Sequence, residues 1–193
     1  MVKGSAQTKE QIVDAAIDAL QTEGFSGATS RAIGRVGGFN QALIFYHFGS
    51  LDALLVEALK KTSEARRERY RVALADVTTI DELVRVGARL YEEDKASGHI
   101  TVVSQLIAGS VGRSDLAPKV LALMEPWIVF AEETLTRILP AGLPTREVAY
   151  AVVTFYMGVN LLTHLDADRT RTDALFARAS ELAPLLGSLF GSR

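Results

Sequence analysis

The sequence predicts an all-α protein, and three observations support this fold class. Apolar residues recur three or four positions apart through most of the chain, which is the spacing of an amphipathic helix. Side chains that can cap helices, together with glycines and prolines, divide the chain into segments of helical length. No stretch alternates apolar and polar residues at the period of two that a half-buried strand requires. The 193 residues are expected to form a small N-terminal domain (1–49) and a larger helical domain (50–193), with about nine helices in all.

A first helix is expected from about residue 8 to residue 23. Thr8 and Gln11 have the spacing of a capping box, in which the two side chains satisfy free amide groups at the start of a helix. The apolar residues that follow keep a helical period, so this helix can cover the two after it. These residues are Ile12, Val13, Ala16, Ile17 and Leu20.

The next segment is expected to form two short helices joined by a tight turn. Thr29 can cap the first helix through its hydroxyl. Gly37 and Gly38 end that helix, because glycine accepts a positive φ without a Cβ clash. Asn40 caps the second helix, which ends at Phe48. Two helices joined in this way form a helix-turn-helix.

Further helices are expected along the rest of the chain. The capping-box pattern recurs at Thr79 and Glu82. Pro126 is expected to kink or interrupt a helix, because proline lacks a backbone N–H and its ring clashes with the preceding turn. The predicted helices cover residues 50–74, 80–97, 100–112, 116–139, 145–165 and 172 to about 187–191.

An aromatic run ends the helix-turn-helix, at Phe45, Tyr46, His47 and Phe48. Exposed to water, such a cluster would waste apolar area, whereas at a DNA duplex its rings can contact sugars, thymine methyls and phosphates. Helical hairpins with a glycine turn are also common as simple packing motifs. The aromatic run therefore favours DNA binding over packing alone.

This segment resembles the DNA-binding domain of the tetracycline-repressor (TetR) family of transcriptional regulators. The matching text is TSRAI at 29–33, GFNQA at 38–42 and IFYHF at 44–48, followed by Ser50, Leu54 and Leu55. The resemblance is close over the N-terminal quarter and extends further only in helix number and length. It implies a DNA-binding surface formed by Thr29, Ser30, Arg31, Asn40, Gln41, Ala42, Leu43, Phe45, Tyr46 and His47.

The chain departs from the family pattern at five positions. Leu51 stands where the family usually places a lysine that holds a phosphate. Phe45 stands where tyrosine is frequent, and Leu43 replaces a common small polar residue. Gly34 and Gly37 fall where alanine is usual, and a glycine inside a helix costs roughly 0.5 to 1 kcal/mol relative to alanine. These departures predict fewer phosphate contacts and a looser N-terminal domain before DNA binds.

The charge pattern is too even to identify a partner. The net charge is −2. Residues 1–71 carry ten basic and eight acidic side chains, and residues 72–193 carry eleven and fifteen. The balance is therefore +2 before residue 72 and −4 after it. A solvated helix face explains the basic residues of 60–71 as well as DNA binding does.

Composition favours a cytoplasmic protein with no membrane partner. Hydrophobic residues make up 48% of the chain, yet no apolar run reaches the roughly 18 residues that a membrane-spanning helix needs. Residues 1–8 are polar and lack the apolar core of a signal peptide. Without cysteine, the chain is expected to have no disulfide, no thiolate metal site and no redox switch.

The last two long helices are expected to form a homodimer. Both carry apolar residues on more than one face, and Ala151 and Gly158 would let a partner helix approach closely. Either apolar stripe alone is also explained as intramolecular core. The family resemblance points to the same pair of helices. A two-fold dimer would present two DNA-binding domains about 34 to 36 Å apart, or a multiple of that spacing, to a palindromic operator of double-stranded DNA. The stripes are Val148, Val152, Phe155, Val159 and Leu162, and Leu175, Ala179, Leu182, Leu186 and Leu189.

The resemblance also implies that a small-molecule effector binds among the middle helices. Candidate lining residues combine aromatic walls with a few polar groups. They are Tyr91, Gln105, Trp127, Phe130, Tyr150, Tyr156, Met157, Asn160 and His164. Core packing is the competing interpretation of each residue. Asn160 and His164 are the best polar pair because they lie four residues apart, and no third ligand at metal spacing accompanies them.

An enzyme is the competing class, and it would need convergent acid, base or nucleophile groups. The three histidines are scattered, and the chain has no G-x-S-x-G, Walker or H-E-x-x-H pattern. Acidic residues at 92–94 and 132–133 are expected to be solvated, because adjacent helical residues point in different directions. We therefore expect no catalytic residue, no metal ligand and no cofactor.

The residues and the resemblance together predict a homodimeric repressor that a small apolar or aromatic effector releases from a palindromic operator. In this hypothesis the helix at 50–74 links the DNA-binding and ligand-binding domains. An effector shifts the equilibrium only as far as it prefers the released state. The alternative is a helical small-molecule sensor or carrier with weak or lost DNA binding. Leu51, Gly34 and Gly37 are consistent with it, and the aromatic run opposes it.

Overall fold

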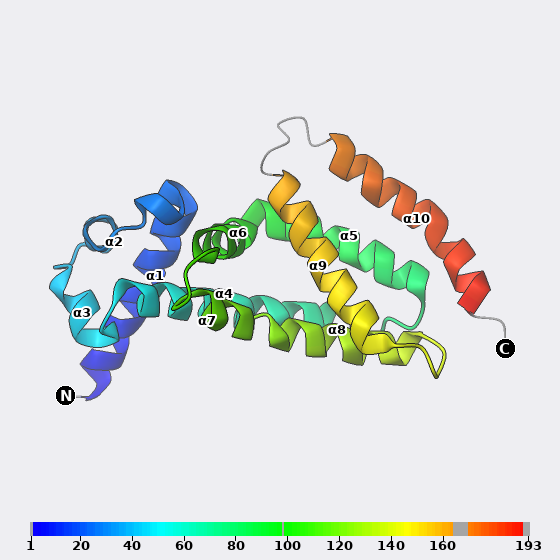
Figure 1. The fold of residues 1–193 in the computed structure, drawn as a ribbon, viewed down its shortest axis with the longest axis horizontal. Coiled ribbons are helices and arrows are strands. Elements are labelled where there is room, and N and C mark those ends of the chain that lie inside the picture. The colour runs from blue at the N-terminus through cyan, green and yellow to red at the C-terminus, as the bar shows by residue number, and fades with distance from the viewer. Residues whose placement is uncertain (1, 98, 164–169, 191–193) are drawn as a thin grey trace. The chain divides into compact units, whose positions relative to one another are not determined.

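The computed structural model describes residues 2–97, 99–163 and 170–190. Within these ranges the protein has ten helices and no strand, which confirms the all-α prediction (Figure 1). The chain forms two compact units. The first consists of Met1–Ala65 and Gly98–Leu123, and the second of Arg66–Ser97 and Met124–Arg193.

The first unit is built around an N-terminal group of three helices. It contains α1 (Val2–Gly27), α2 (Ser30–Gly37), α3 (Ala42–Phe48), residues 51–65 of α4 (Leu51–Ala73), α6 (His99–Ser110) and α7 (Ala117–Ala122). Helix α1 packs against both α2 and α6. The core is fully buried at Ile12, Leu20, Ile33, Ile44 and Leu106, and each such side chain contributes about 1.5 to 3 kcal/mol through burial. Helices α1, α2 and α3 form the head of this unit.

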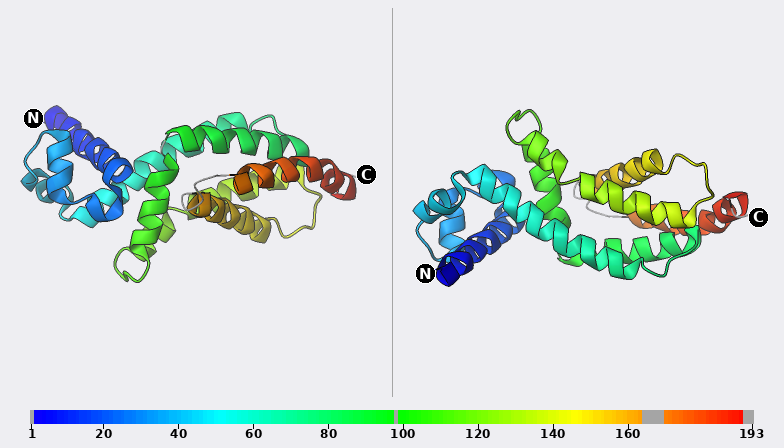
Figure 2. Two further views of the ribbon diagram at one scale, coloured as in Figure 1. Left: turned by 90° about the horizontal axis from the view of Figure 1, so that it is seen from above. Right: turned by 90° about the horizontal axis from the view of Figure 1, so that it is seen from below.

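The second unit consists of two helix pairs and the end of α4. It contains residues 66–73 of α4, α5 (Ile80–Ser97), α8 (Glu125–Ile138), α9 (Thr145–Thr163) and α10 (Thr170–Phe190). Helix α8 packs against α9, and α10 lies along α5 (Figure 2). One buried apolar cluster joins Ile128 and Leu135 of α8 to Ala149 of α9.

The two predicted capping boxes differ in outcome. At the start of α5, Thr79 Oγ1 accepts from Glu82 N at 3.2 Å, and the Glu82 carboxylate accepts from Thr78 N at 3.0 Å. This cap is confirmed. The cap at Thr8 is wrong, because α1 begins earlier and the Thr8 hydroxyl donates to the Gly4 carbonyl at 2.8 Å. Inside a helix, a threonine hydroxyl bonds to the preceding turn.

The segment predicted as one interrupted helix at 116–139 is two helices, α7 and α8. Pro126 lies in the first turn of α8, where its missing N–H leaves no bond unmade. The predicted interruption is therefore confirmed, and it raises the number of helices in the described ranges to ten.

The predicted domain boundary between residues 49 and 50 lies inside the first compact unit. It separates the head from α4 and stays a prediction. Over the part of the chain that the structure describes, no single helix is long and apolar enough to cross a bilayer, although the bent pair α3 and α4 reaches that length and composition together.

Candidate DNA-binding surface and buried polar cluster

Two side-chain caps and one glycine fix the helix-turn-helix. Thr29 Oγ1 accepts from Ala32 N at 3.2 Å at the start of α2. Gly38 ends α2 in the left-handed conformation, with φ at 67°. Asn40 Oδ1 then accepts from Ala42 N at 2.9 Å at the start of α3. All three local predictions are confirmed, and the side chains of Thr29 and Asn40 hold the backbone of the helix-turn-helix.

The glycines of α2 give the turn room to pack. A Cβ on Gly34 would lie 2.8 Å from the Phe39 carbonyl oxygen. A Cβ on Gly37 would lie 2.1 Å from the Phe39 ring and 2.8 Å from the Ala15 Cβ. These separations are shorter than carbon and oxygen atoms tolerate. The two glycines therefore allow the turn and α1 to approach α2 closely, and their low helix propensity is offset by this packing.

The exposed side of α3 carries most of the predicted DNA-binding residues. Tyr46 is 81% exposed and Phe45 is 49% exposed. The Tyr46 ring stands edge-on to His47, with ring centroids 4.8 Å apart. Ile44 is fully buried and Leu43 is half-buried, so α3 turns its other side into the head. Tyrosine and phenylalanine rings are therefore available on one surface, and Tyr46 takes no part in the buried core of the head.

The start of α2 meets the start of α3 at a hydrogen bond. Ser30 Oγ donates to Gln41 Oε1 at 3.2 Å. A shallow depression of about 310 Å³ lies beside this bond and is lined by Arg31, Gln41 and Phe39 among others. The structure thus brings Ser30, Arg31 and Gln41 together, as a surface that reads a duplex requires. Ala42 follows Gln41 and is exposed.

The two arginines of α2 differ in their ion pairs. Arg35 pairs with Glu23 at 2.7 Å. No described residue forms an ion pair with Arg31, which is exposed. Leu51 begins α4 and is half-buried, and the next residue, Asp52, pairs with Arg113 from the loop after α6. Of these two arginines, Arg31 is therefore the one that is free to bind a phosphate or a base.

Helix α6 supports the end of α1. The backbone leaves helical geometry at Gly24, where φ is 70°. The next N–H, of Phe25, donates to Gln105 Oε1 at 3.0 Å. A Cβ on Gly109 would lie 2.4 Å from the Phe25 ring, so only glycine lets the ring approach α6 this closely. Gln105, predicted to line a ligand site, thus lies in the first unit and holds α1.

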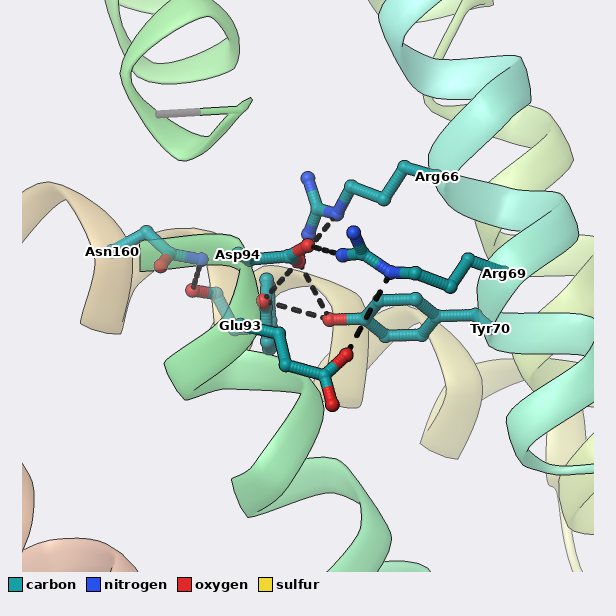
Figure 3. A network of polar contacts seen from close by, with 7 residues as sticks. Arg66, Arg69, Tyr70, Glu93, Asp94 and Asn160 are labelled. Carbon is teal, nitrogen blue, oxygen red and sulfur yellow. Dashed lines mark hydrogen bonds and ion pairs between the residues drawn. The ribbon is translucent and has the colours of Figure 1, made fainter. Parts of the chain in front are cut away.

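The second unit contains a buried polar cluster centred on Asp94 of α5, which is 0% exposed. Arg66 of α4 contacts it through Nε at 2.6 Å from Oδ2, and Arg69 bonds to Oδ1. The hydroxyls of Tyr70 and Tyr156 donate to Oδ2 at 2.8 and 2.9 Å (Figure 3). These five residues, from α4, α5 and α9, form the polar cluster.

Aromatic rings surround the buried guanidinium of the cluster. Arg66 is 3% exposed, and its guanidinium carbon lies 4.8 Å from the Trp127 ring centre, 5.2 Å from that of Tyr156 and 5.5 Å from that of Tyr70. At such distances the ring faces attract a cation. Burial raises the pKa of Tyr156 to about 12 and raises the pKa of Tyr70 above its usual range. Both phenols therefore stay protonated and donate at neutral pH.

Five predicted ligand-binding residues lie in or around this cluster. Tyr156 belongs to it, and Trp127 packs on Arg66. Tyr91 is buried, with its ring centre 5.9 Å from that of Tyr156. The ring centre of Phe130 lies 6.3 Å from that of Trp127. Asn160 is buried and donates through Nδ2 to the Tyr156 carbonyl at 2.8 Å.

The other four predicted residues are placed differently. Gln105 belongs to the first unit. Tyr150 of α9 is exposed, and Met157 is half-buried on the same helix. His164 lies outside the described residues, so its proposed pairing with Asn160 stays a prediction.

Sequence reasoning missed this cluster. It expected Asp94 to be solvated, left Arg66 and Arg69 open between a solvated face and DNA binding, and did not single out Tyr70. Glu92 and Glu93 are indeed exposed, but Asp94 is not. A signal was present in the periodicity. Asp94 follows Leu90 by four residues and Tyr91 by three, so it continues the buried face of α5.

Comparison with known proteins connects the chain to one family. A sequence profile described as "Bacterial regulatory proteins, tetR family" matches residues 12–58, which include α2 and α3. No curated protein matches the chain by sequence. Solved structures with a similar fold include a TetR-family transcriptional regulator from Cytophaga hutchinsonii, at 13% identity and a TM-score of 0.79, covering 94% of this chain and 95% of that one.

Two similar structures contain ligands. The transcriptional regulator FadR from Bacillus subtilis, in complex with stearoyl-CoA, matches at 17% identity and a TM-score of 0.72, covering 90% of this chain and 96% of its own. The multidrug binding protein EbrR, complexed with imidazole, matches at 24% identity and a TM-score of 0.63, covering 89% and 93%. At these identities the likeness shows the fold.

Proposed function

We propose that this chain, which belongs to the tetR family of bacterial regulatory proteins, is a DNA-binding transcriptional regulator that responds to a small molecule. It acts in the cytoplasm, where the DNA is. As a homodimer it occupies a palindromic operator and blocks transcription, and an effector releases it.

The observation that carries the proposal is the exposed surface of the head. Tyr46 is almost entirely exposed while Ile44, two residues away on the same helix, is fully buried. Gln41 and Arg31 lie beside each other at the start of the two helices. Arginine and glutamine are the side chains that read guanine and adenine in the major groove, and aromatic rings contact sugars and thymine methyls. The predicted roles of Thr29, Ser30, Asn40, Ala42, Leu43, Phe45 and His47 at DNA belong to this proposal.

Exposed apolar side chains on the last two helices support the homodimer. Val148 and Val159 of α9 are turned inward. Val152, Phe155 and Leu162 of the same helix are exposed, with Leu162 at 64%. Leu175 and Leu182 of α10 are exposed as well. A second copy covering these side chains would remove a large apolar area from water.

Leu162→Glu tests the homodimer. A charge buried at the centre of an interface costs about 2 kcal/mol or more, so the variant should sediment as a monomer at concentrations where the wild type is a dimer. Leu121→Glu is the matched control, because Leu121 of α7 is 66% exposed and lies on the other unit. If the two variants sediment alike, α9 is not the interface.

The effector part of the proposal is supported by the polar and aromatic residues of the second unit. Tyr91, Trp127, Tyr156 and Asn160 place rings and polar groups around one buried site. The FadR relative is described in complex with stearoyl-CoA and the EbrR relative with imidazole. We infer that a small apolar or aromatic molecule binds at the corresponding place here.

Selection of bound sequences from random double-stranded DNA tests the DNA-binding function. The purified protein should recover an inverted repeat whose half-sites lie one or more helical turns apart. Recovery of sequences without two-fold symmetry would rule out the dimeric operator complex. A protein that recovers no sequence at all, but binds small molecules, would instead be the helical sensor or carrier of the alternative hypothesis.

A further inference from the structure

We propose that the polar cluster is an anion-binding site which Asp94 fills in this structure, and that the effector is a carboxylate with an apolar body that takes the place of the Asp94 side chain. This proposal rests on the proposed effector-binding function and names the chemical class of the effector. It concerns only residues of the second unit.

The first step of the argument is the chemistry of the groups around Asp94. Its carboxylate receives two guanidinium groups, from Arg66 and Arg69, and two phenol hydroxyls, from Tyr70 and Tyr156. Arg69, Tyr70 and Tyr156 donate hydrogen bonds to the carboxylate, and Arg66 forms an ion pair with it, so donors and positive charge surround its acceptor oxygens. Figure 3 shows the α4 side chains reaching this one carboxylate from the neighbouring helix. The donors are complementary to a carboxylate, whichever molecule carries it.

The second step is that an incoming anion can replace the Asp94 carboxylate more readily than an incoming cation can replace the Arg66 guanidinium. An incoming cation would have to displace Arg66, which is buried beneath three rings, and would leave that guanidinium without its carboxylate. An incoming carboxylate displaces only Asp94. Exposed residues Glu92, Glu93 and Ala96 flank Asp94 in the sequence of α5, and the displaced Asp94 side chain would move towards this exposed side of the helix.

The third step concerns the body of the ligand. The rings of Tyr70 and Trp127 meet edge to face with centroids 5.3 Å apart. Tyr91 lies between two other rings, 5.9 Å from Tyr156 and 4.7 Å from Phe176. A molecule whose head group enters the cluster therefore meets aromatic walls on several helices. An aliphatic chain or aromatic ring on the carboxylate gains contact area there.

Displacement also predicts an unusual effect of removing Asp94. Because Asp94 is tethered to the site, it competes with a dissolved carboxylate at a high effective concentration. Removing its charge should therefore strengthen the binding of an external acid. A purely structural network predicts no such gain.

The test measures binding through the fluorescence of Trp127, which is the only tryptophan of the chain and lies 4.8 Å from the Arg66 guanidinium. Three probes of one shape are compared, namely 4-phenylbutyrate, 4-phenylbutanol and 4-phenylbutylamine. Wild type should bind the acid about tenfold more tightly than the alcohol or the amine, because charge-assisted hydrogen bonds discriminate by that order. The decyl series of acid, alcohol and amine repeats the comparison with an aliphatic body.

Two variants are expected to change the affinity for the acid in opposite directions. Asp94→Asn should raise the affinity for the acid about tenfold, because the competing charge is gone. Arg69→Gln should lower it about tenfold, since one charged donor is lost. Glu133→Gln, at an exposed acid of α8, removes the same charge as Asp94→Asn and should leave the affinity unchanged.

Equal binding of the three head groups in both series, a preference for the amine, or no acid binding at all would overturn the anion site. So would an unchanged or lower acid affinity in Asp94→Asn that folds as wild type by circular dichroism. If Asp94→Asn does not fold, the wild-type head-group comparison and Arg69→Gln decide. If the wild-type protein binds its selected operator but does not prefer the acid, only the anion-site proposal is rejected. If it prefers the acid but selects no DNA, the proposed regulatory function is rejected instead.

Discussion

The head and the polar cluster use the same residue types in opposite ways. Tyr46 is 81% exposed and Arg31 has no ion pair among the described residues. In the cluster, Tyr70, Tyr156 and Arg66 are all held by one carboxylate. Tyrosine and arginine exposed without partners can bind an external molecule at little cost to the fold. The same residues buried and paired cannot be changed without a loss of stability.

The largest effect that this contrast predicts belongs to Asp94→Ala. The substitution leaves Arg66 buried without its carboxylate, and breaking a buried pair in this way lowers the free energy of unfolding by about 3 to 5 kcal/mol. Urea unfolding followed by circular dichroism measures it. Glu133→Ala, an exposed acid of α8, should change stability by less than about 0.5 kcal/mol. If the two variants are equally stable, the cluster does not hold the second unit together.

Two glycine substitutions should change the free energy of unfolding in opposite directions. Gly34→Ala places a Cβ 2.8 Å from the Phe39 carbonyl oxygen and should lower the free energy of unfolding by about 1 to 3 kcal/mol. Gly87→Ala in α5 meets no atom within 4 Å and should raise it by about 0.5 to 1 kcal/mol through helix propensity. A stabilised Gly34→Ala variant would mean that the turn does not pack on α2 as described.

Two tyrosine substitutions test whether binding and stability separate between the regions. Tyr46→Ala should weaken binding to the selected operator by about 1 to 3 kcal/mol without changing the urea midpoint. Tyr46→Phe should keep whatever the ring alone contributes. Tyr156→Ala should lower the urea midpoint instead. Operator titration by fluorescence anisotropy and unfolding curves on the same samples give both quantities, and a Tyr46→Ala protein with normal affinity would remove that ring from the DNA surface.

A further effect is a pH dependence confined to the cluster. The pKa of Tyr156 is raised to about 12, above the value of about 10 for an unfolded tyrosine. A raised pKa stabilises the fold below about pH 10 and loses that contribution as pH rises towards 12. Tyr156→Phe should therefore be less stable than wild type by about 1 to 2 kcal/mol at pH 8, and the gap should close between pH 10 and pH 12. A gap that stays constant over this range would contradict the raised pKa.

The head could be predicted from the sequence because its determinants are local. Thr29 bonds to a backbone group three residues ahead, and Asn40 to one two residues ahead. Local pattern has limits even so. Thr8 and Thr79 carry similar spacing, yet only Thr79 caps a helix, since Thr8 lies within a helix that begins earlier. Where a helix begins depends on packing that the capping pattern does not include.

The cluster could not be predicted, because its bonds join residues far apart in sequence. Asp94 meets Arg69 and Tyr156, which lie 25 and 62 residues away. Charged residues are usually solvated, so expecting solvated acids at 92–94, and accepting a solvated face as one explanation of 60–71, followed the general rule. Asp94 and Arg66 are exceptions because α4, α5 and α9 pack together and bury them. A single sequence does not show directly which helices pack together.

The bond between Phe25 and Gln105 has a consequence for how the protein can be divided. The end of α1 is held by a side chain from a helix 80 residues further along, and the Phe25 ring packs on Gly109 of that helix. A fragment that stops at residue 65 would keep every residue of the head and still lose this support. We therefore expect the head to be a portable module, able to fold and be fused elsewhere, only when α6 is transferred with it.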